Sequence, residues 1–185
     1  MRIAISLIFL FLLSVKFNSA FAEDKRQEET YIKVGVFDYI HQTDMYAVNR
    51  KKVTDNYLNI KYLGELTQIY DLMLMGDVRE GYSDKAILKE REEYAIYFSS
   101  GYQKNFNLSE NVIFAPSFSV GLYESFDQGK KMGLPIEFKT EIELNYKTKN
   151  DLIFNITYNH ISNADIGNTN PGSDNFLVGF RYKTN

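Results

Sequence analysis

The sequence of 185 residues contains no cysteine, two histidines and three prolines. The lack of cysteine excludes disulfide frameworks, thiol nucleophiles, and zinc or iron–sulfur sites with cysteine ligands. Two histidines are too few for a zinc site built on three of them, and the chain has neither a Gly-rich phosphate loop nor an EF-hand loop. A net charge of only −3 argues against a nucleic-acid partner. We therefore expect no metal and no cofactor.

Aromatic residues, in contrast, are abundant. The chain has 14 Tyr and 14 Phe, and 44% of its residues are hydrophobic. A chain of this composition is too apolar and too aromatic to be disordered. Its length suits one ordered domain.

The first 22 residues have the pattern of a secretory signal peptide. Arg2 supplies a positive charge, Ile3–Val15 is a nearly unbroken apolar run, and small residues stand at Ala20 and Ala22, where signal peptidase reads the chain. The apolar run is too short to cross a bilayer as a helix, which disfavours an uncleaved membrane anchor. We expect residues 1–22 to be a signal peptide and residues 23–185 to form one exported domain.

Period-two alternation predicts strands along most of the remaining chain. In Ile136–Tyr146 the even positions are apolar apart from a threonine, whereas the odd positions are charged or polar. Leu152–Tyr158 and Phe176–Tyr182 repeat the pattern. Weaker candidates for strands are Tyr31–Tyr39, Asn56–Leu63, Asp71–Arg79, Glu93–Gln103 and Val112–Leu122. Together with the three clear strands, they give a total of about eight. Ala86–Glu93 has the composition of a short helix in a loop.

Two architectures fit such strands: a soluble sandwich or lipocalin-like barrel with an apolar interior, and an outer-membrane barrel with an apolar exterior. Export, strands of about ten residues and a strongly charged polar face favour the membrane barrel. On that face, Glu137, Lys139, Glu141 and Glu143 have the types to form ion pairs in a narrow lumen. We therefore predict an all-β fold, an eight-stranded antiparallel transmembrane β-barrel of the outer-membrane type. Its tight turn is Lys147–Asn150, and its long polar connections, expected outside the cell, are 40–55, 80–92, 123–135 and 161–173.

Three polar residues break the apolar face near the end of the chain. His160 and Ser162 share the parity of the apolar residues before them, and Asp174 shares that of the apolar residues after it. All three should therefore face lipid at the extracellular end. Placing a polar side chain there costs free energy, so its presence indicates a function. A serine, a histidine and an acid are the types of a nucleophile, its base and the group that orients the base. The alternative is an ordinary polar edge where a strand enters a loop.

The segment His160-Ile-Ser-Asn-Ala164, followed by Asn170-Pro-Gly172 and a final amphipathic strand, resembles the signature of the PagL-type lipid A 3-O-deacylases. These are also called outer-membrane acyloxyacyl hydrolases, and the resemblance is strongest over residues 134–182. It implies an eight-stranded barrel with a Ser-His-Glu triad on its outer wall. By position, the base is His160, the nucleophile Ser162, the oxyanion residue Asn163, and the acid Asp174, with Asp in place of Glu.

The expected function is that of an outer-membrane serine esterase in a Gram-negative cell. It would remove an ester-linked acyl chain, at the 3-O position by resemblance, from lipid A of lipopolysaccharide in the outer leaflet. The alternatives are a non-catalytic barrel for adhesion or envelope integrity, and an outer-membrane phospholipase. The acid is open between Asp174 and Asp165, and a dyad completed by water or Asn175 is a further alternative. The sequence also allows a homodimer.

Overall fold

The computed structural model describes residues 28–39, 45–77, 93–127, 130–149 and 152–183. The predicted signal peptide lies outside these residues and stays a prediction. The helix considered at Ala86–Glu93 also falls outside them, except for Glu93, which begins a strand. In the described part of the chain, no helix is long and apolar enough to cross a membrane.

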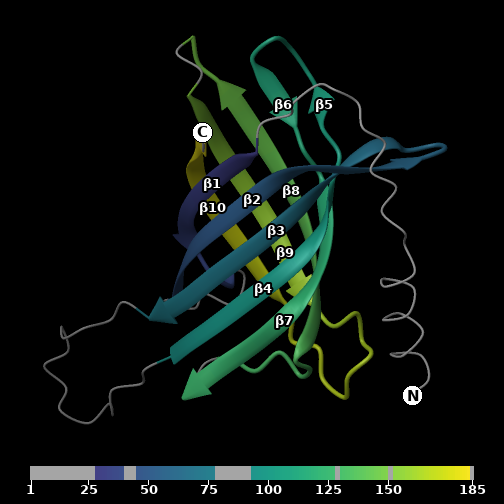
Figure 1. Ribbon diagram of the computed structural model, residues 1–185. Coiled ribbons are helices and arrows are strands. Elements are labelled where there is room, and N and C mark those ends of the chain that lie inside the picture. Colours follow the sequence, from purple (N-terminus) through teal and green to yellow (C-terminus); the bar gives the residue numbers. More distant parts are fainter. Residues whose placement is uncertain (1–27, 40–44, 78–92, 128–129, 150–151, 184–185) are drawn as a thin grey trace, which may run out of the picture.

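Eight strands form a closed antiparallel barrel (Figure 1). Each strand pairs with its neighbour around the wall, and the ring closes between β1 and β10 and between β8 and β9. The predicted eight-stranded barrel is thus confirmed. The strands of the ring are β1 (Glu29–Val36), β2 (Met45–Ile60), β3 (Gly64–Asp77), β4 (Glu93–Gln103), β7 (Ser117–Asp127), β8 (Ile136–Lys147), β9 (Ile153–Ser162) and β10 (Ser173–Lys183).

The two ends of the barrel differ in their connections. One end, here called the loop end, carries the connections 37–44, 78–92, 128–135 and 163–172. The opposite end, the turn end, carries the tight connections 61–63 and 148–152, and a longer one between β4 and β7. This longer connection contains a short hairpin of β5 (Phe106–Asn107) and β6 (Val112–Phe114), and β6 pairs with the last residues of β8.

The alternation in the sequence places apolar side chains outside the barrel and polar ones inside. Along β8, Ile142, Leu144 and Tyr146 are exposed, whereas Glu143 and Asn145 between them are buried. A soluble barrel would bury its apolar face, so this inverted pattern is that of a barrel surrounded by lipid.

The middle of the lumen is filled by buried charges that form ion pairs. Lys51 Nζ lies 2.8 Å from Glu141 Oε1 and 2.6 Å from Glu143 Oε1. Lys139 Nζ lies 3.0 Å from Glu141 Oε2 and also pairs with Asp71. Buried charges are tolerated when they are paired in this way. The predicted pairing of charges inside the lumen is confirmed for Lys139, Glu141 and Glu143, whereas Glu137 is buried and forms no ion pair with the described residues.

Apolar side chains fill the lumen at the loop end. Met132, from the connection after β7, is buried together with Ile161 of β9 and Leu177 of β10, and Phe37 and Tyr97 belong to the same cluster. The lumen is therefore packed with ion pairs in the middle and apolar groups at the loop end.

The structure corrects two predicted connections. The segment 40–55 was predicted to be a loop because of its run of polar residues, but β2 begins at Met45. The reason is that Asn49 and Lys51 point into the charged lumen, where they contact Asp71 and Glu141. The connection 123–135 is also shorter than predicted, because β7 continues to Asp127.

Three predicted strands have different bounds in the structure. The strand predicted at Asn56–Leu63 is the end of β2 and the turn that follows it, and the strand predicted to begin at Asp71 begins at Gly64. The strand predicted at Val112–Leu122 is divided into β6 and β7 around Pro116, which has no N–H to donate to a ladder.

Candidate active site

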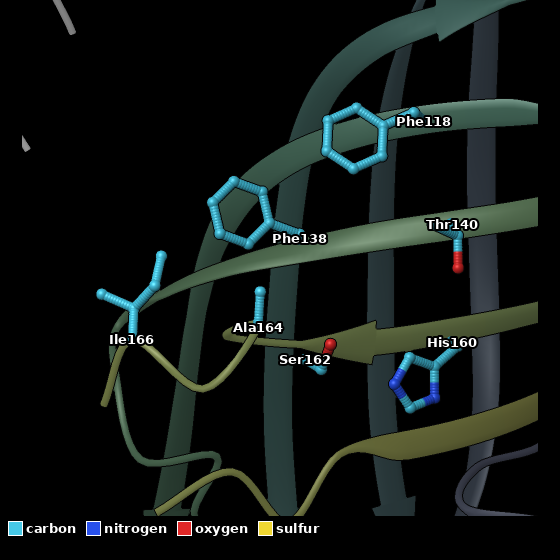
Figure 2. Close-up of a pocket in the computed structure, with 7 residues that line it drawn as sticks. All are labelled: Phe118, Phe138, Thr140, His160, Ser162, Ala164 and Ile166. Atoms are coloured by element: carbon cyan, nitrogen blue, oxygen red, sulfur yellow. The ribbon is translucent and has the colours of Figure 1, made fainter. Parts of the chain in front are cut away.

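A groove runs along the outer wall across β7, β8 and β9, and it lies at the loop end of β8 and β9 (Figure 2). It has a volume of about 290 Å³ and is mostly apolar. The rings of Phe118 and Phe138 stack in it, with centroids 6.0 Å apart. The side chains that line the groove are Phe118, Phe138, Thr140, His160, Ser162, Ala164 and Ile166.

Strand register brings the acid to the histidine. Asp174 of β10 is the direct partner of His160 on β9, and its Oδ1 lies 2.9 Å from His160 Nδ1. The imidazole is 40% exposed toward the outer wall, whereas the Asp174 carboxylate is 13% exposed. A carboxylate at Nδ1 fixes the ring orientation and favours the tautomer with its proton on Nδ1.

Ser162 lies two residues beyond His160 on the same face of β9. Residues with this spacing are about 6.6 Å apart along a strand, so their side chains are neighbours. Because Nδ1 contacts Asp174, the free nitrogen is Nε2, and Figure 2 shows one ring nitrogen turned toward the Ser162 hydroxyl. The structure thus brings together the three residue types of a serine esterase in the predicted order.

The loop after β9 is held in a fixed shape by Asn163. Its side chain is fully buried, and its Nδ2 donates to the Met132 carbonyl at 2.9 Å and to the Thr169 carbonyl at 2.8 Å. Its backbone N–H donates to Asn170 Oδ1 at 3.1 Å. Asn163 therefore points inward, away from the groove, and both of its donors are engaged within the protein.

The two alternatives to Asp174, a second acid and an amide, lie elsewhere. Asp165 Oδ1 accepts a hydrogen bond of 2.9 Å from Asn170 Nδ2, so its carboxylate braces the loop. Asn175 is fully buried on the lumen side, where its Nδ2 donates to Asn159 Oδ1 at 2.7 Å. Of these candidates for the acid, Asp174 is the one that contacts the imidazole.

Two features of the site were missed by reasoning from the sequence. Tyr158 counted as one more apolar residue of the outer face, but its hydroxyl donates to Asp174. Gly172 has a φ of 59° and lies against the imidazole, so that a Cβ built there would be 3.0 Å from His160 Cε1. The alternation pattern shows the face that each residue takes, whereas these contacts depend on the path of the loop.

A sequence profile of the family described as Lipid A 3-O-deacylase (PagL) matches residues 61–183. The chain belongs to the PagL family. The match spans most of the barrel wall, including β8, β9 and β10, on which His160, Ser162 and Asp174 lie. It makes the chain a member of a family of lipid A deacylases, which are outer-membrane hydrolases.

Solved structures support the fold of this PagL family member. A crystal structure described as the outer membrane enzyme PagL has 14% sequence identity and a TM-score of 0.55, and the match covers 84% of this chain and 99% of that chain. A crystal structure of Neisserial surface protein A (NspA) has 9% identity and a TM-score of 0.54, with coverage of 85% and 95%. Both are similar in fold to this chain, which confirms a barrel of the outer-membrane type. No curated protein matches the sequence.

Proposed function

We propose that this protein is an outer-membrane serine esterase that removes an ester-linked acyl chain from lipid A, at the 3-O position that names its family. The observation that carries the proposal is the contact between His160 Nδ1 and Asp174 Oδ1 on the lipid-facing wall, beside Ser162. Polar groups on such a wall are costly, and a catalytic role gives the reason for their presence.

The proposed reaction proceeds through an acyl-enzyme. Ser162 Oγ attacks the ester carbonyl while His160 Nε2 takes its proton, and Asp174 stabilises the imidazolium that forms. Collapse of the tetrahedral intermediate breaks the bond to the sugar oxygen, which leaves with the proton from His160. Water, activated by the same imidazole, then attacks the acyl-enzyme, releases the fatty acid and restores Ser162.

The groove suits an acyl chain. Its stacked rings, Phe118 and Phe138, and the nearby Ile166 present an apolar surface beside the Ser162 hydroxyl. An opening on the outer wall admits a lipid that diffuses laterally in the membrane.

A homodimer is compatible with this arrangement, and chemical cross-linking in the outer membrane tests it.

Asn163 is proposed to serve the oxyanion site. The side-chain and backbone N–H groups of Asn163 already donate hydrogen bonds within the protein. Asn163 therefore donates to the oxyanion only if one of these hydrogen bonds, such as that to Asn170, is exchanged for one to the substrate. Its other contribution is to fix the loop that follows Ser162, so that the backbone there is preorganised for the developing charge.

Mass spectrometry of lipid A from cells that express the protein tests the proposal. The wild type should release one acyl chain, and Ser162→Ala should abolish the release. Ser100→Ala is a matched control, because Ser100 is a half-buried serine of β4 outside the groove. Identical lipid A from the wild type and Ser162→Ala would refute the proposed substrate. Purified protein assayed with defined phospholipids separates this activity from that of a phospholipase, and unchanged lipids in both assays would favour a non-catalytic barrel for adhesion or envelope integrity.

A further inference from the structure

The Asp174 carboxylate accepts a hydrogen bond from a second residue of β9. The Tyr158 hydroxyl donates to Asp174 Oδ1, the oxygen that lies 2.9 Å from His160 Nδ1. We propose that Tyr158 is a positioning residue of the active site, which holds the carboxylate in the orientation that the imidazole requires. The inference rests on the proposed function, because it gives Tyr158 a part in the chemistry of Ser162.

Strand geometry explains how the phenol reaches the acid. Tyr158 and His160 point to the same side of β9, and their direct partners on β10 are Phe176 and Asp174. Asp174 is therefore the diagonal neighbour of Tyr158, at a Cα distance of about 7–8 Å that an aromatic side chain can bridge. The same residue is the direct neighbour of His160. The Asp174 carboxylate thus contacts two side chains of β9.

The surroundings of Asp174 make a second donor valuable. The carboxylate belongs to the lipid-facing wall and is 13% exposed, so few water molecules can solvate it. A charged oxygen in such a place is stabilised by hydrogen bonds from the protein. A carboxylate held by His160 alone would keep its freedom to rotate about its last torsion. The Tyr158 hydroxyl, bound to the same oxygen, restrains that rotation.

An ordinary role for Tyr158 would be that of an exposed aromatic residue at the membrane interface. Tyr158 is 41% exposed, and the outer wall carries other exposed tyrosines. One of them, Tyr146, is 52% exposed on β8 near the turn end, and it does not line the groove. Tyr146→Phe is therefore a matched control for Tyr158→Phe, since both remove one hydroxyl from the outer wall.

The test combines kinetics with magnetic resonance on the full-length protein in detergent micelles. Deacylation of purified lipid A is measured for the wild type, Ser162→Ala, Tyr158→Phe and Tyr146→Phe. The Nδ1–H signal of His160 is recorded from ¹⁵N-labelled protein. The chain has two histidines, so the signal that persists in His41→Gln belongs to His160.

We expect Tyr158→Phe to lower kcat about tenfold with little change in KM, because it removes a hydrogen bond to a charged acceptor. It should also shift the His160 Nδ1–H signal, whereas Tyr146→Phe should leave both quantities at their wild-type values. Electrophoretic mobility of the folded barrel should be the same in all variants.

Two results would overturn the inference. One is a wild-type kcat in Tyr158→Phe while Ser162→Ala is inactive. The other is a lower kcat with an unmoved His160 signal, which would show that Tyr158 acts on the substrate and not through Asp174. Failure of the proposed function is a separate result, since the wild type and Ser162→Ala would then leave lipid A equally unchanged.

Discussion

Replacing Asp174 with asparagine removes a negative charge while it retains the shape of the side chain. The amide oxygen can still accept hydrogen bonds from Tyr158 and His160, so the barrel and the loop should assemble as before. The imidazolium that forms when Ser162 attacks, however, loses its counter-charge. The same change in a comparable triad lowers turnover about 10⁴-fold, which corresponds to about 5.4 kcal/mol of activation free energy.

The assay for this prediction is the rate of fatty-acid release from purified lipid A, with folding checked by the mobility of the barrel on a gel. Asp174→Glu should keep most of the activity, because it retains the charge beside His160. Asp165→Ala should cost much less than Asp174→Asn, because Asp165 binds Asn170 and not the imidazole. Activity that survives Asp174→Asn but is abolished by Asp165→Ala would show that the acid is misassigned. Little loss in both variants would indicate a dyad.

Three further changes have defined outcomes. Gly172→Ala should reduce the deacylation rate without unfolding the barrel, because a Cβ at a φ of 59° is strained and meets His160 Cε1 at 3.0 Å; an unaffected rate would show that the imidazole tolerates displacement. Lys139→Met should lower the free energy of unfolding in urea by about 3–5 kcal/mol, because it removes a partner from buried Asp71 and Glu141. An unchanged urea midpoint would contradict this, and Leu144→Met on the lipid-facing side is the control. N-terminal sequencing of the exported protein should begin at Glu23, and a sequence that begins at Met1 would contradict the predicted signal peptide.

The alternation of side chains predicted the barrel and the face of each site residue. It worked best in β8, β9 and β10, where most outward positions are apolar and most inward positions are polar. It failed at the start of β2, because Asn49 and Lys51 are polar residues of a strand whose inner face is charged. A polar run therefore indicates a loop in a protein with an apolar interior, but in a barrel with an apolar exterior it is equally compatible with a strand.

The contacts of the site were less predictable than its residues. Parity placed His160, Ser162 and Asp174 on one face, and the register of β9 with β10 brings Asp174 opposite His160. No local pattern indicates that Asn163 turns inward to bind two carbonyl groups, since this depends on the connection after β7 that supplies the Met132 carbonyl. The hydrogen bond from Tyr158 to Asp174 is likewise a diagonal contact between β9 and β10, and the sequence of one strand does not indicate it.

The position of the groove bears on how a lipid would reach Ser162 in the proposed reaction. Ion pairs around Glu141 and the apolar cluster with Met132 lie inside the barrel, on the opposite side of the wall from the groove. The groove lies on the outer wall, and Ser162 is the last residue of β9 at the loop end. This position suits an ester whose acyl chain remains in the membrane while its sugar stays at the surface. In the proposed reaction, water would reach the acyl-enzyme from the loop end, past Gly172 and the half-exposed imidazole of His160.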